Sequence, residues 1–280
     1  LPRLLLAAII GAGLATCGVI MQAIVKNPLA DPYILGISAG ASLGATSAVL
    51  LGIGAALGEN AVGVAAFLGA FAVSVGVLFI ANLGGRANAM KLLLGGMALS
   101  AVCSAFSSFI VYFANDKEGI QTITYWMMGS LAGARWDHMA LIGGIVALAV
   151  LFFWTQSRIL NLMLLGDESA ITLGTDLHPY RQAYLIVSAL VVGFAVFAAG
   201  MIGFVGLVVP HVVRMLVGTD HKRLIPVTAL TGAIFLVVAD GLCRVLIPHT
   251  ELPIGILISL VGAPAFIYLM VKRTYGFGGQ

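Results

Sequence analysis

The sequence predicts an all-α polytopic membrane protein, and composition and hydropathy pattern both support this. Of the 280 residues, 61% are hydrophobic and 9% are charged, whereas a soluble domain carries roughly 25% charged residues. The mean hydropathy is +1.10. Polar connections separate apolar segments of about 20 residues, the length that crosses a hydrocarbon layer as a helix. The 35 glycines are typical of helices that pack closely in a membrane.

Nine apolar segments meet this length criterion. We expect spans at 2–25, 33–52, 61–83, 88–114, 137–156, 181–199, 202–217, 224–246 and 253–272. The seventh is short because Pro210, His211 and Arg214 interrupt its second half. The first segment is not interpreted as a signal peptide, because the apolar pattern continues through the rest of the chain. The whole chain, 1–280, is therefore expected to be one transmembrane domain.

The positions of Lys and Arg predict the orientation. If the connection KNPLADP faces the cytoplasm and the spans alternate, only four of the 14 lysines and arginines lie outside: Arg3, Lys117, Arg135 and Arg244. Both KNPLADP and TDHKRLIP lead into Ala- and Gly-rich segments. This similarity favours an inverted repeat, in which the last four spans repeat the first four with the opposite direction.

The polar stretch GDESAITLGTDLHPYR separates two long apolar runs. We expect two short helices here, the first capped by Asp167 and ended by Gly174. The second is expected to begin at Thr175 or Asp176, with Pro179 near its first turn. Short capped helices outside the lipid favour a docking surface for another protein. An ordinary loop between two spans is the alternative.

Glycines at every fourth position mark one face of the second expected span. Gly36, Gly40 and Gly44 form a double G-x-x-x-G pattern, which leaves a flat groove along a helix. Close packing on a neighbouring helix is favoured over contact with a ligand.

Four serines lie on one face of the fourth expected span. Ser100, Ser104, Ser107 and Ser108 fall at i, i+4, i+7 and i+8. A serine in a membrane helix can bond to its own i−4 carbonyl, so it needs no pore. A face that lines water or substrate and an ordinary helix face therefore both remain open.

Asp240 lies inside an apolar run, with Arg244 four residues later. An intramembrane acid is a functional candidate, but the pair can neutralise itself at i,i+4, which favours a structural ion pair over a proton relay. The chain contains no H-E-x-x-H, no G-x-S-x-G and no G-x-x-x-x-G-K-[ST] sequence. We therefore expect no enzyme and no metal site, and any ATP must bind to another subunit.

Four motifs resemble the permease subunits of bacterial ATP-binding-cassette importers for iron–siderophore complexes, haem and cobalamin. They are NPLADPYILGISAGASLGA (27–45), GDESAITLG (166–174), GMIGFVGLVVPHVVRMLVGTDHKRLIP (200–226) and ELPIGILISLVGAPAFIYLM (251–270). The resemblance implies a ten-span, multi-pass protein of the bacterial inner membrane, so a further span is expected before Leu1. It also implies a homodimer with a path along its two-fold axis. The implied partners are two copies of a P-loop ATPase subunit, which hold ATP and Mg, and an extracytoplasmic substrate-binding protein, without nucleic acid.

The resemblance also implies residue roles. Asp167, Glu168, Ala170, Leu173 and Gly174 fall on the cytoplasmic coupling helices, residues 166–180, which fit into a cleft of the ATPase. The small Ala170 would let the docked surfaces approach. The serine stripe would line the path.

The resemblance further places Asn27 and Leu29 at the cytoplasmic gate. Arg3 and Arg244 match positions that receive acidic residues of the binding protein, with Asp240 orienting Arg244. The substrate is expected to be a ferric siderophore or haem, because GISAGASLGA resembles the iron-chelate branch. A cobalamin permease is the alternative, and an ion-coupled secondary transporter is the alternative from another class.

Overall fold

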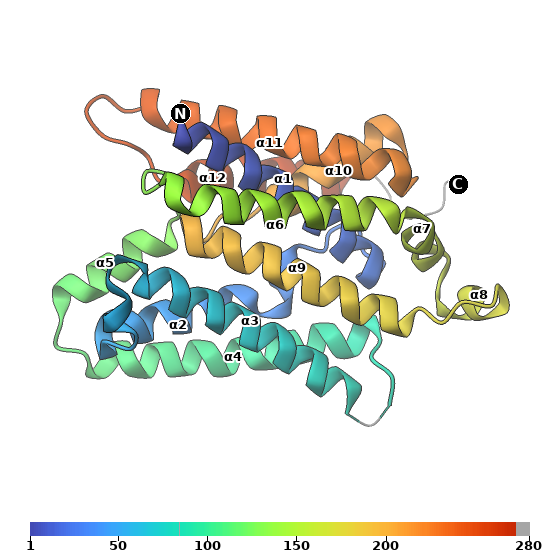
Figure 1. The fold of residues 1–280 in the computed structure, drawn as a ribbon, viewed down its shortest axis with the longest axis horizontal. Helices are drawn as coiled ribbons and strands as arrows, with labels where there is room; N and C mark the ends of the chain where they lie inside the picture. The colour runs from blue at the N-terminus through green and yellow to red at the C-terminus, as the bar shows by residue number, and fades with distance from the viewer. Residues whose placement is uncertain (84, 273–280) are drawn as a thin grey trace.

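The computed structural model describes residues 1–83 and 85–272, and helices build this part of the chain (Figure 1). In order they are α1 (Pro2–Val25), η1 (Pro32–Leu35), α2 (Ile37–Leu51), η2 (Ala55–Asn60), α3 (Ala61–Asn82), α4 (Ala89–Phe113), α5 (Lys117–Met127), α6 (Trp136–Thr155), α7 (Ser157–Leu165), α8 (Asp167–Thr172), α9 (His178–Ala199), α10 (Val205–Val217), α11 (His221–Val245) and α12 (Ile254–Lys272). The all-α expectation is confirmed for the described residues. Two short helices, α5 and α7, were not among the expected spans.

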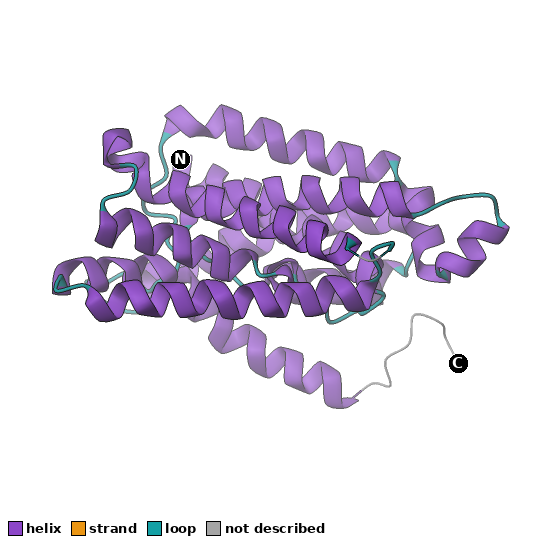
Figure 2. Cartoon of the chain, turned by 90° about the horizontal axis from the view of Figure 1, so that it is seen from below, coloured by secondary structure: helices purple, strands orange, loops and turns teal. Residues whose placement is uncertain are grey.

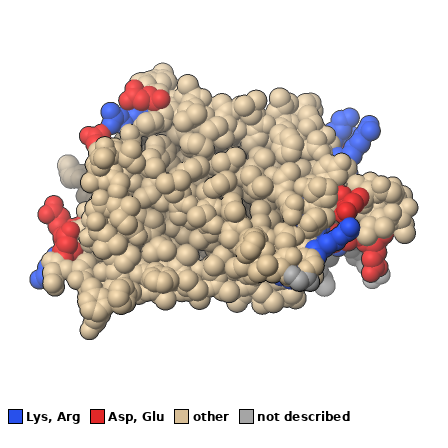
Figure 3. Space-filling view, turned by 60° about the horizontal axis from the view of Figure 1, so that its bottom comes forward, with Lys and Arg blue, Asp and Glu red and all other residues tan. Residues whose placement is uncertain are grey.

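The long helices form an apolar body with charges at its two ends. Among the described residues, α1, α3, α4, α6, α9 and α11 are long and apolar enough to cross a membrane. The shorter apolar helices α2, α10 and α12 occupy the other three expected positions. Figure 3 shows Lys, Arg, Asp and Glu gathered at the two ends of the molecule, with a broad band free of them between. This distribution is the one that a bilayer requires of a multi-pass protein.

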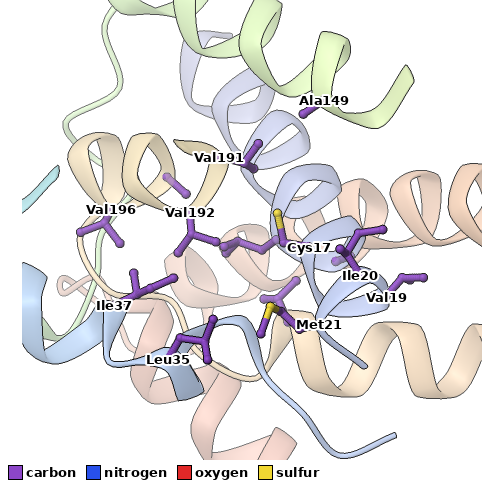
Figure 4. Close-up of a cluster of buried hydrophobic side chains, with 14 of the residues drawn as sticks. Cys17, Val19, Ile20, Met21, Leu35, Ile37, Ala149, Val191, Val192 and Val196 are labelled. Carbon is purple, nitrogen blue, oxygen red and sulfur yellow. The ribbon is translucent and has the colours of Figure 1, made fainter. Parts of the chain in front are cut away.

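The helix α1 runs through the centre of the bundle. Of its most apolar 18 residues, 72% are buried inside the chain, against 17% for α4. It packs against α6, α9, α10 and α11. Figure 4 shows Cys17 and Met21 among side chains of α9, such as Val192, and of η1, such as Leu35. A helix that is apolar on all sides is expected in such a buried position.

Small residues let α1 touch the backbones of its neighbours. Gly11 lies against Gly232 of α11, and Gly18 lies against Gly206 of α10. At both positions a Cβ atom would collide with a carbonyl group of the neighbouring helix. In a membrane, where lipid tails are as apolar as the side chains, such close van der Waals contact is a main source of helix association.

The helices α2 and α10 are too short to cross a bilayer alone. Their 15 and 13 residues extend about 22 and 20 Å, against roughly 30 Å of hydrocarbon. Non-helical segments, residues 26–36 and 200–204, precede them. Pro32 contacts Gly206, which lies against Gly18, seven residues before α1 ends and therefore about 10 Å inside the bundle.

Residues 26–36 therefore re-enter the bundle, and we call them the re-entrant segment. The expectation of a helical span over 33–52 is wrong at its beginning, because the short η1 comes first and α2 begins at Ile37. Gly36 joins the two with φ +79°, a left-handed conformation that glycine adopts without a Cβ penalty.

The packing of the long helices is consistent with the expected inverted repeat. A shift of five spans relates α1 to α9 and α3 to α11. Accordingly, α1 packs along α11, and α9 packs along α3. The same shift relates α2 to α10, and both are short helices preceded by an interruption. Discontinuous helices in corresponding positions of two halves are typical of transporters.

The contact between Gly18 and Gly206 gives a first prediction. In Gly18→Ala, the added methyl group forces α1 and α10 apart, so the free energy of unfolding should fall by about 1–3 kcal/mol, as for other overpacked sites. Thermal unfolding of the purified protein in mild detergent measures the change. Gly144→Ala is the matched control, because nothing lies within 4 Å of a Cβ atom at Gly144. Equal stability of both variants would contradict this account of the α1–α10 contact.

Candidate functional site

The helix α8 projects beyond the bundle at one end of the molecule (Figure 1). Gly166 is its N-cap residue, and Asp167 and Glu168 lie in its first turn, where negative charge is favourable. The expectation that Asp167 is the cap is therefore wrong. The second short helix expected from Thr175 or Asp176 is also not separate. It is the first turn of α9, where the Asp176 side chain accepts a hydrogen bond from the His178 N–H at 3.0 Å.

The outer surface of α8 and its flanks is apolar. Leu165, Ile171 and Leu173 are 64%, 58% and 66% exposed, and Glu168 and Gly174 are exposed beside them. Ala170, in contrast, is completely buried within the chain. The expectation that Ala170 lies on the docking surface is therefore corrected: its side chain packs inward, and the exposed leucines and isoleucine form the surface.

Arg181 of α9 fixes α8 to the bundle. Its side chain is 5% exposed, and Nη2 donates to the Asp167 carboxylate at 2.6 Å. Nη1 donates to the backbone carbonyl of Ala87 at 3.1 Å. Sequence reasoning placed Arg181 in the polar stretch but assigned it no role.

A second polar contact fixes α7, the helix before α8. The Asn161 amide donates to the Asp220 carboxylate at 2.8 Å, and its oxygen accepts from the His221 N–H at 2.9 Å. The hydrogen bond from Asn161, together with one from the Lys222 N–H, lowers the pKa of Asp220. These contacts hold α7 against the beginning of α11.

The interruptions before α2 and α10 meet at a pocket of about 390 Å³, which we call the break pocket. Its lining residues are Asp31, Tyr33, Ser38, Met201, Gly203, Phe204 and Leu207. The Asp31 carboxylate accepts from the Tyr33 N–H at 2.8 Å and so caps η1. The Ser38 hydroxyl donates to the Met201 sulfur at 2.9 Å across the pocket. Non-helical backbone is tolerated at this depth only where protein buries it or where it lines a cavity.

Sequence reasoning missed the break pocket. It treated Asp31 as part of a cytoplasmic turn and Phe204 as part of a helix. A signal was present, since the second and seventh expected spans were short or interrupted in corresponding positions, and such pairs of interrupted segments point to the binding region of transporters.

The two gate candidates lie at the beginning of the re-entrant segment. The Asn27 side chain accepts from the Leu29 N–H at 2.9 Å, and Lys26 before it has a left-handed φ of 54°. Asn27 is exposed and Leu29 half-buried. The fold therefore connects both residues to Asp31 and the break pocket through a few residues of chain.

The serine stripe lies on the least buried of the long helices, α4. Ser104 and Ser108 are exposed, and Ser100 and Ser107 are half-buried. Ser100 reaches the junction of η1 and α2, because its hydroxyl lies 2.9 Å from the Cβ position of Gly36. Figure 2 shows α12, the helix that leads into the grey trace, set apart from the rest of the bundle. Both α4 and α12 thus present large surfaces that this chain does not cover.

The glycines of α2 lie against α3. Gly40 contacts the backbone of Gly69, and Gly44 contacts the backbone of Ala65. Gly36 does not share this face, because it precedes α2. The structure therefore gives Gly40 and Gly44 the packing position that the sequence favoured.

Four charged side chains form a cluster at the other end of the molecule. Asp240 is buried and accepts from Arg3 Nε at 2.8 Å and from Arg244. Arg3 Nη1 also binds Glu251 at 2.7 Å. The expected pair of Asp240 and Arg244 is confirmed, but Asp240 is shared with Arg3. The cluster has no net formal charge, and the Arg3 side chain is 18% exposed against 36% for Arg244.

Comparison with known proteins gives one consistent family. The model of the FecCD transport family matches residues 1–272. The hemin transport system permease protein HmuU of Yersinia pestis is 40% identical over 98% of this chain and 82% of its own length. The cobalamin import system permease protein BtuC of Halobacterium salinarum is 42% identical over 98% of this chain and 72% of its own length.

Solved structures show the same fold. A metal-chelate type ABC transporter in an inward-facing conformation matches with a TM-score of 0.89 and 34% identity, over 97% of this chain and 85% of the other. PsaBC from Streptococcus pneumoniae matches with a TM-score of 0.68 and 17% identity, over 97% and 94% of the two chains. This second likeness concerns the fold alone.

The charge cluster gives a second prediction. Arg3→Gln leaves the buried Asp240 with one cation and releases Glu251, so the free energy of unfolding should fall by about 1–3 kcal/mol. Arg135→Gln is the control, because it removes exposed pairs with Glu59 and Asp137, which are worth about 0.2–1 kcal/mol. Thermal unfolding in detergent compares the two variants. An equal loss of stability in both would show that the buried cluster has no special role in the fold.

Proposed function

The chain belongs to the FecCD transport family and is a permease of an ABC importer, and we propose that it moves a ferric siderophore or haem into the bacterial cytoplasm by alternating access. Two relatives named above carry haem and cobalamin in their names, and both compounds are large metal chelates. The haem permease supports the iron-chelate proposal. The cobalamin permease makes cobalamin the alternative. Membership of this family leaves the ion-coupled secondary transporter without support.

The break pocket is the observation that carries the proposed path. It places Asp31, Tyr33 and Ser38 beside Met201 and Phe204 in an otherwise apolar body. Polar groups and interrupted helices at this depth are typical of a route for substrate. The exposed serines of α4 extend from the junction next to this pocket. We therefore propose that the serine stripe lines the path, and that Asn27 and Leu29 close it toward the cytoplasm.

A homodimer would enclose this path. The uncovered surfaces of α4 and α12 include Leu94, Phe106, Leu260 and Val261, which are all largely exposed in the single chain. Large contiguous apolar surfaces mark contacts with other proteins or with lipid. We propose that two copies meet through these helices and leave the serines toward the axis.

The apolar surface of α8 is the proposed docking site of the ATPase. It lies beyond the apolar band of the bundle, so lipid does not cover it (Figure 1). Exposed apolar side chains in that position fit a groove on a soluble partner. Two P-loop ATPase subunits would bind there with ATP and Mg, and their closure would push on α8.

The charge cluster at the opposite end is the proposed contact for the substrate-binding protein. Arg244 is the more available cation, because Arg3 already binds Asp240 and Glu251. Charges at the rim of such a contact mainly fix the register and speed the encounter.

Uptake by proteoliposomes tests the proposed function. Vesicles that contain the permease, its ATPase and its binding protein should take up haem or a ferric hydroxamate only when ATP is inside the ATPase compartment. Uptake of cyanocobalamin alone would replace the iron-chelate proposal by the cobalamin alternative. Uptake that needs no ATP would contradict the importer mechanism.

The docking surface gives a third prediction. Leu173→Glu places a charge on the exposed apolar surface of α8, so the ATPase should co-purify in strongly reduced amount. Leu173→Met keeps the apolar surface and should bind the ATPase like the unchanged protein. Both variants should remain folded, because Leu173 is exposed. Equal ATPase recovery in the two preparations would remove α8 from the contact.

The serine stripe gives a fourth prediction. Ser104→Phe narrows the proposed path and should reduce uptake by about tenfold or more, as one misplaced group can cost 100-fold in a positioned site. Val102→Phe is the control, because Val102 is exposed on the opposite face of α4. Assembly with the ATPase should persist in both. If Val102→Phe reduces uptake as strongly as Ser104→Phe, the stripe does not face the path.

A further inference from the structure

Three segments that are distant in the sequence converge at Arg181. They are α8, the first turn of α9 and residues 85–88, which precede α4. The guanidinium group is buried and donates to one acceptor on each of the other two segments, the Asp167 carboxylate at 2.6 Å and the Ala87 carbonyl at 3.1 Å. A single side chain therefore links the proposed docking helix to the segment that leads into the serine-bearing helix.

The bond to Ala87 fixes the beginning of α4. Ala87 is buried and immediately precedes Asn88, the N-cap of α4, whose side chain accepts from the Lys91 N–H at 2.8 Å. The backbone that Arg181 holds is therefore continuous with the first turn of the helix. A movement of Arg181 is transmitted to this turn without an intervening flexible stretch.

The helix α4 carries such a movement to the path. It continues for 25 residues without proline, so it can move as one rod. Ser100 lies about 18 Å along its axis from Asn88, and Ser104 about 24 Å. α4 also packs against η1, and Ser100 lies beside Gly36 at the junction with α2. A shift of α4 therefore acts on both the serine stripe and the re-entrant segment.

We propose that Arg181 is the positioning residue that couples α8 to α4, so that closure of the docked ATPase moves the path-lining helix. This proposal rests on the proposed function, in which α8 receives the ATPase. Arginine suits the task because its planar fork holds two acceptors at once in fixed geometry. Burial removes competition from water and strengthens both hydrogen bonds. Lysine has a single point of charge and cannot hold both acceptors in the same way.

A second contact between the same segments supplies a matched control. Arg86 and Asp176 form an ion pair at 3.3 Å, but their side chains are 69% and 49% exposed. Exposed pairs contribute little to rigidity or stability. Arg86→Gln therefore removes a link with the same endpoints but without the buried geometry.

The test uses the assembled permease–ATPase complex in lipid nanodiscs and needs no transported substrate. Ser104→Cys places a thiol reporter on α4, at a position that is exposed in the single chain. The native Cys17, Cys103 and Cys243 are buried, and the complex without the reporter measures their background. A water-soluble maleimide then labels the reporter with the ATPase either free of nucleotide or trapped with ADP and vanadate. ATPase binding to the permease and ATP hydrolysis are measured on the same samples.

We expect nucleotide to change the labelling rate about five- to tenfold in the reporter protein, within the usual range of coupling between two sites. Arg181→Gln should abolish this response while the ATPase stays bound and hydrolyses ATP. Arg181→Lys should give a smaller response than the reporter protein, and Arg86→Gln should give the full response. These readouts separate coupling from simple stability, because a purely structural loss would affect ATPase binding as well.

Two outcomes would overturn the proposal. One is a full nucleotide response in Arg181→Gln, and the other is loss of ATPase binding in both Arg181→Gln and Arg181→Lys, which would make Arg181 part of the docking surface. Failure of the proposed function is distinguishable, because the protein with native Arg181 would then bind no ATPase.

Discussion

The structure depends on one constraint, which is that backbone N–H and C=O groups inside a bilayer must find partners within the protein. Helices satisfy it locally, and they account for the long elements of the chain. The two interruptions at residues 26–36 and 200–204 are permitted because they face each other and line the break pocket. Here Asp31 caps η1, and Ser38 binds Met201. The same constraint that makes the body helical therefore marks the place where it is not.

Lipid provides no hydrophobic drive for helices to associate, so close contact must do so. The central helix α1 shows how this is achieved, with Gly11 and Gly18 against the backbones of α11 and α10. Polar side chains join the ends of the bundle. Asp240 with its two arginines lies at one end, and Arg181 with Asp167 lies at the other. A close-packed centre with linked ends can transmit a push from one surface to the path.

Hydropathy and charge were sufficient to predict the all-α class, the positions of the long helices and the pair of Asp240 and Arg244, because length and local spacing determine these features. Depth could not be predicted in this way. Asp31 looked like part of a surface turn, since its sequence neighbours are polar, and only its contacts through Pro32 and Gly206 place it inside the bundle. The burial of Ala170 and the bond from Arg181 to Ala87 likewise depend on segments that are far apart in the sequence. The motif placed these residues near the docking site but not on their correct faces.

The central claim is that the break pocket belongs to a path open to one side of the membrane at a time. Ser38 lines this pocket, so the decisive measurement is the labelling of Ser38→Cys by membrane-impermeant thiol reagents, applied from each side of proteoliposomes that contain the complex. The account predicts labelling from one side without nucleotide and from the other side with the ATPase trapped by ADP and vanadate. Labelling that is absent from both sides, or unchanged by nucleotide, would contradict it.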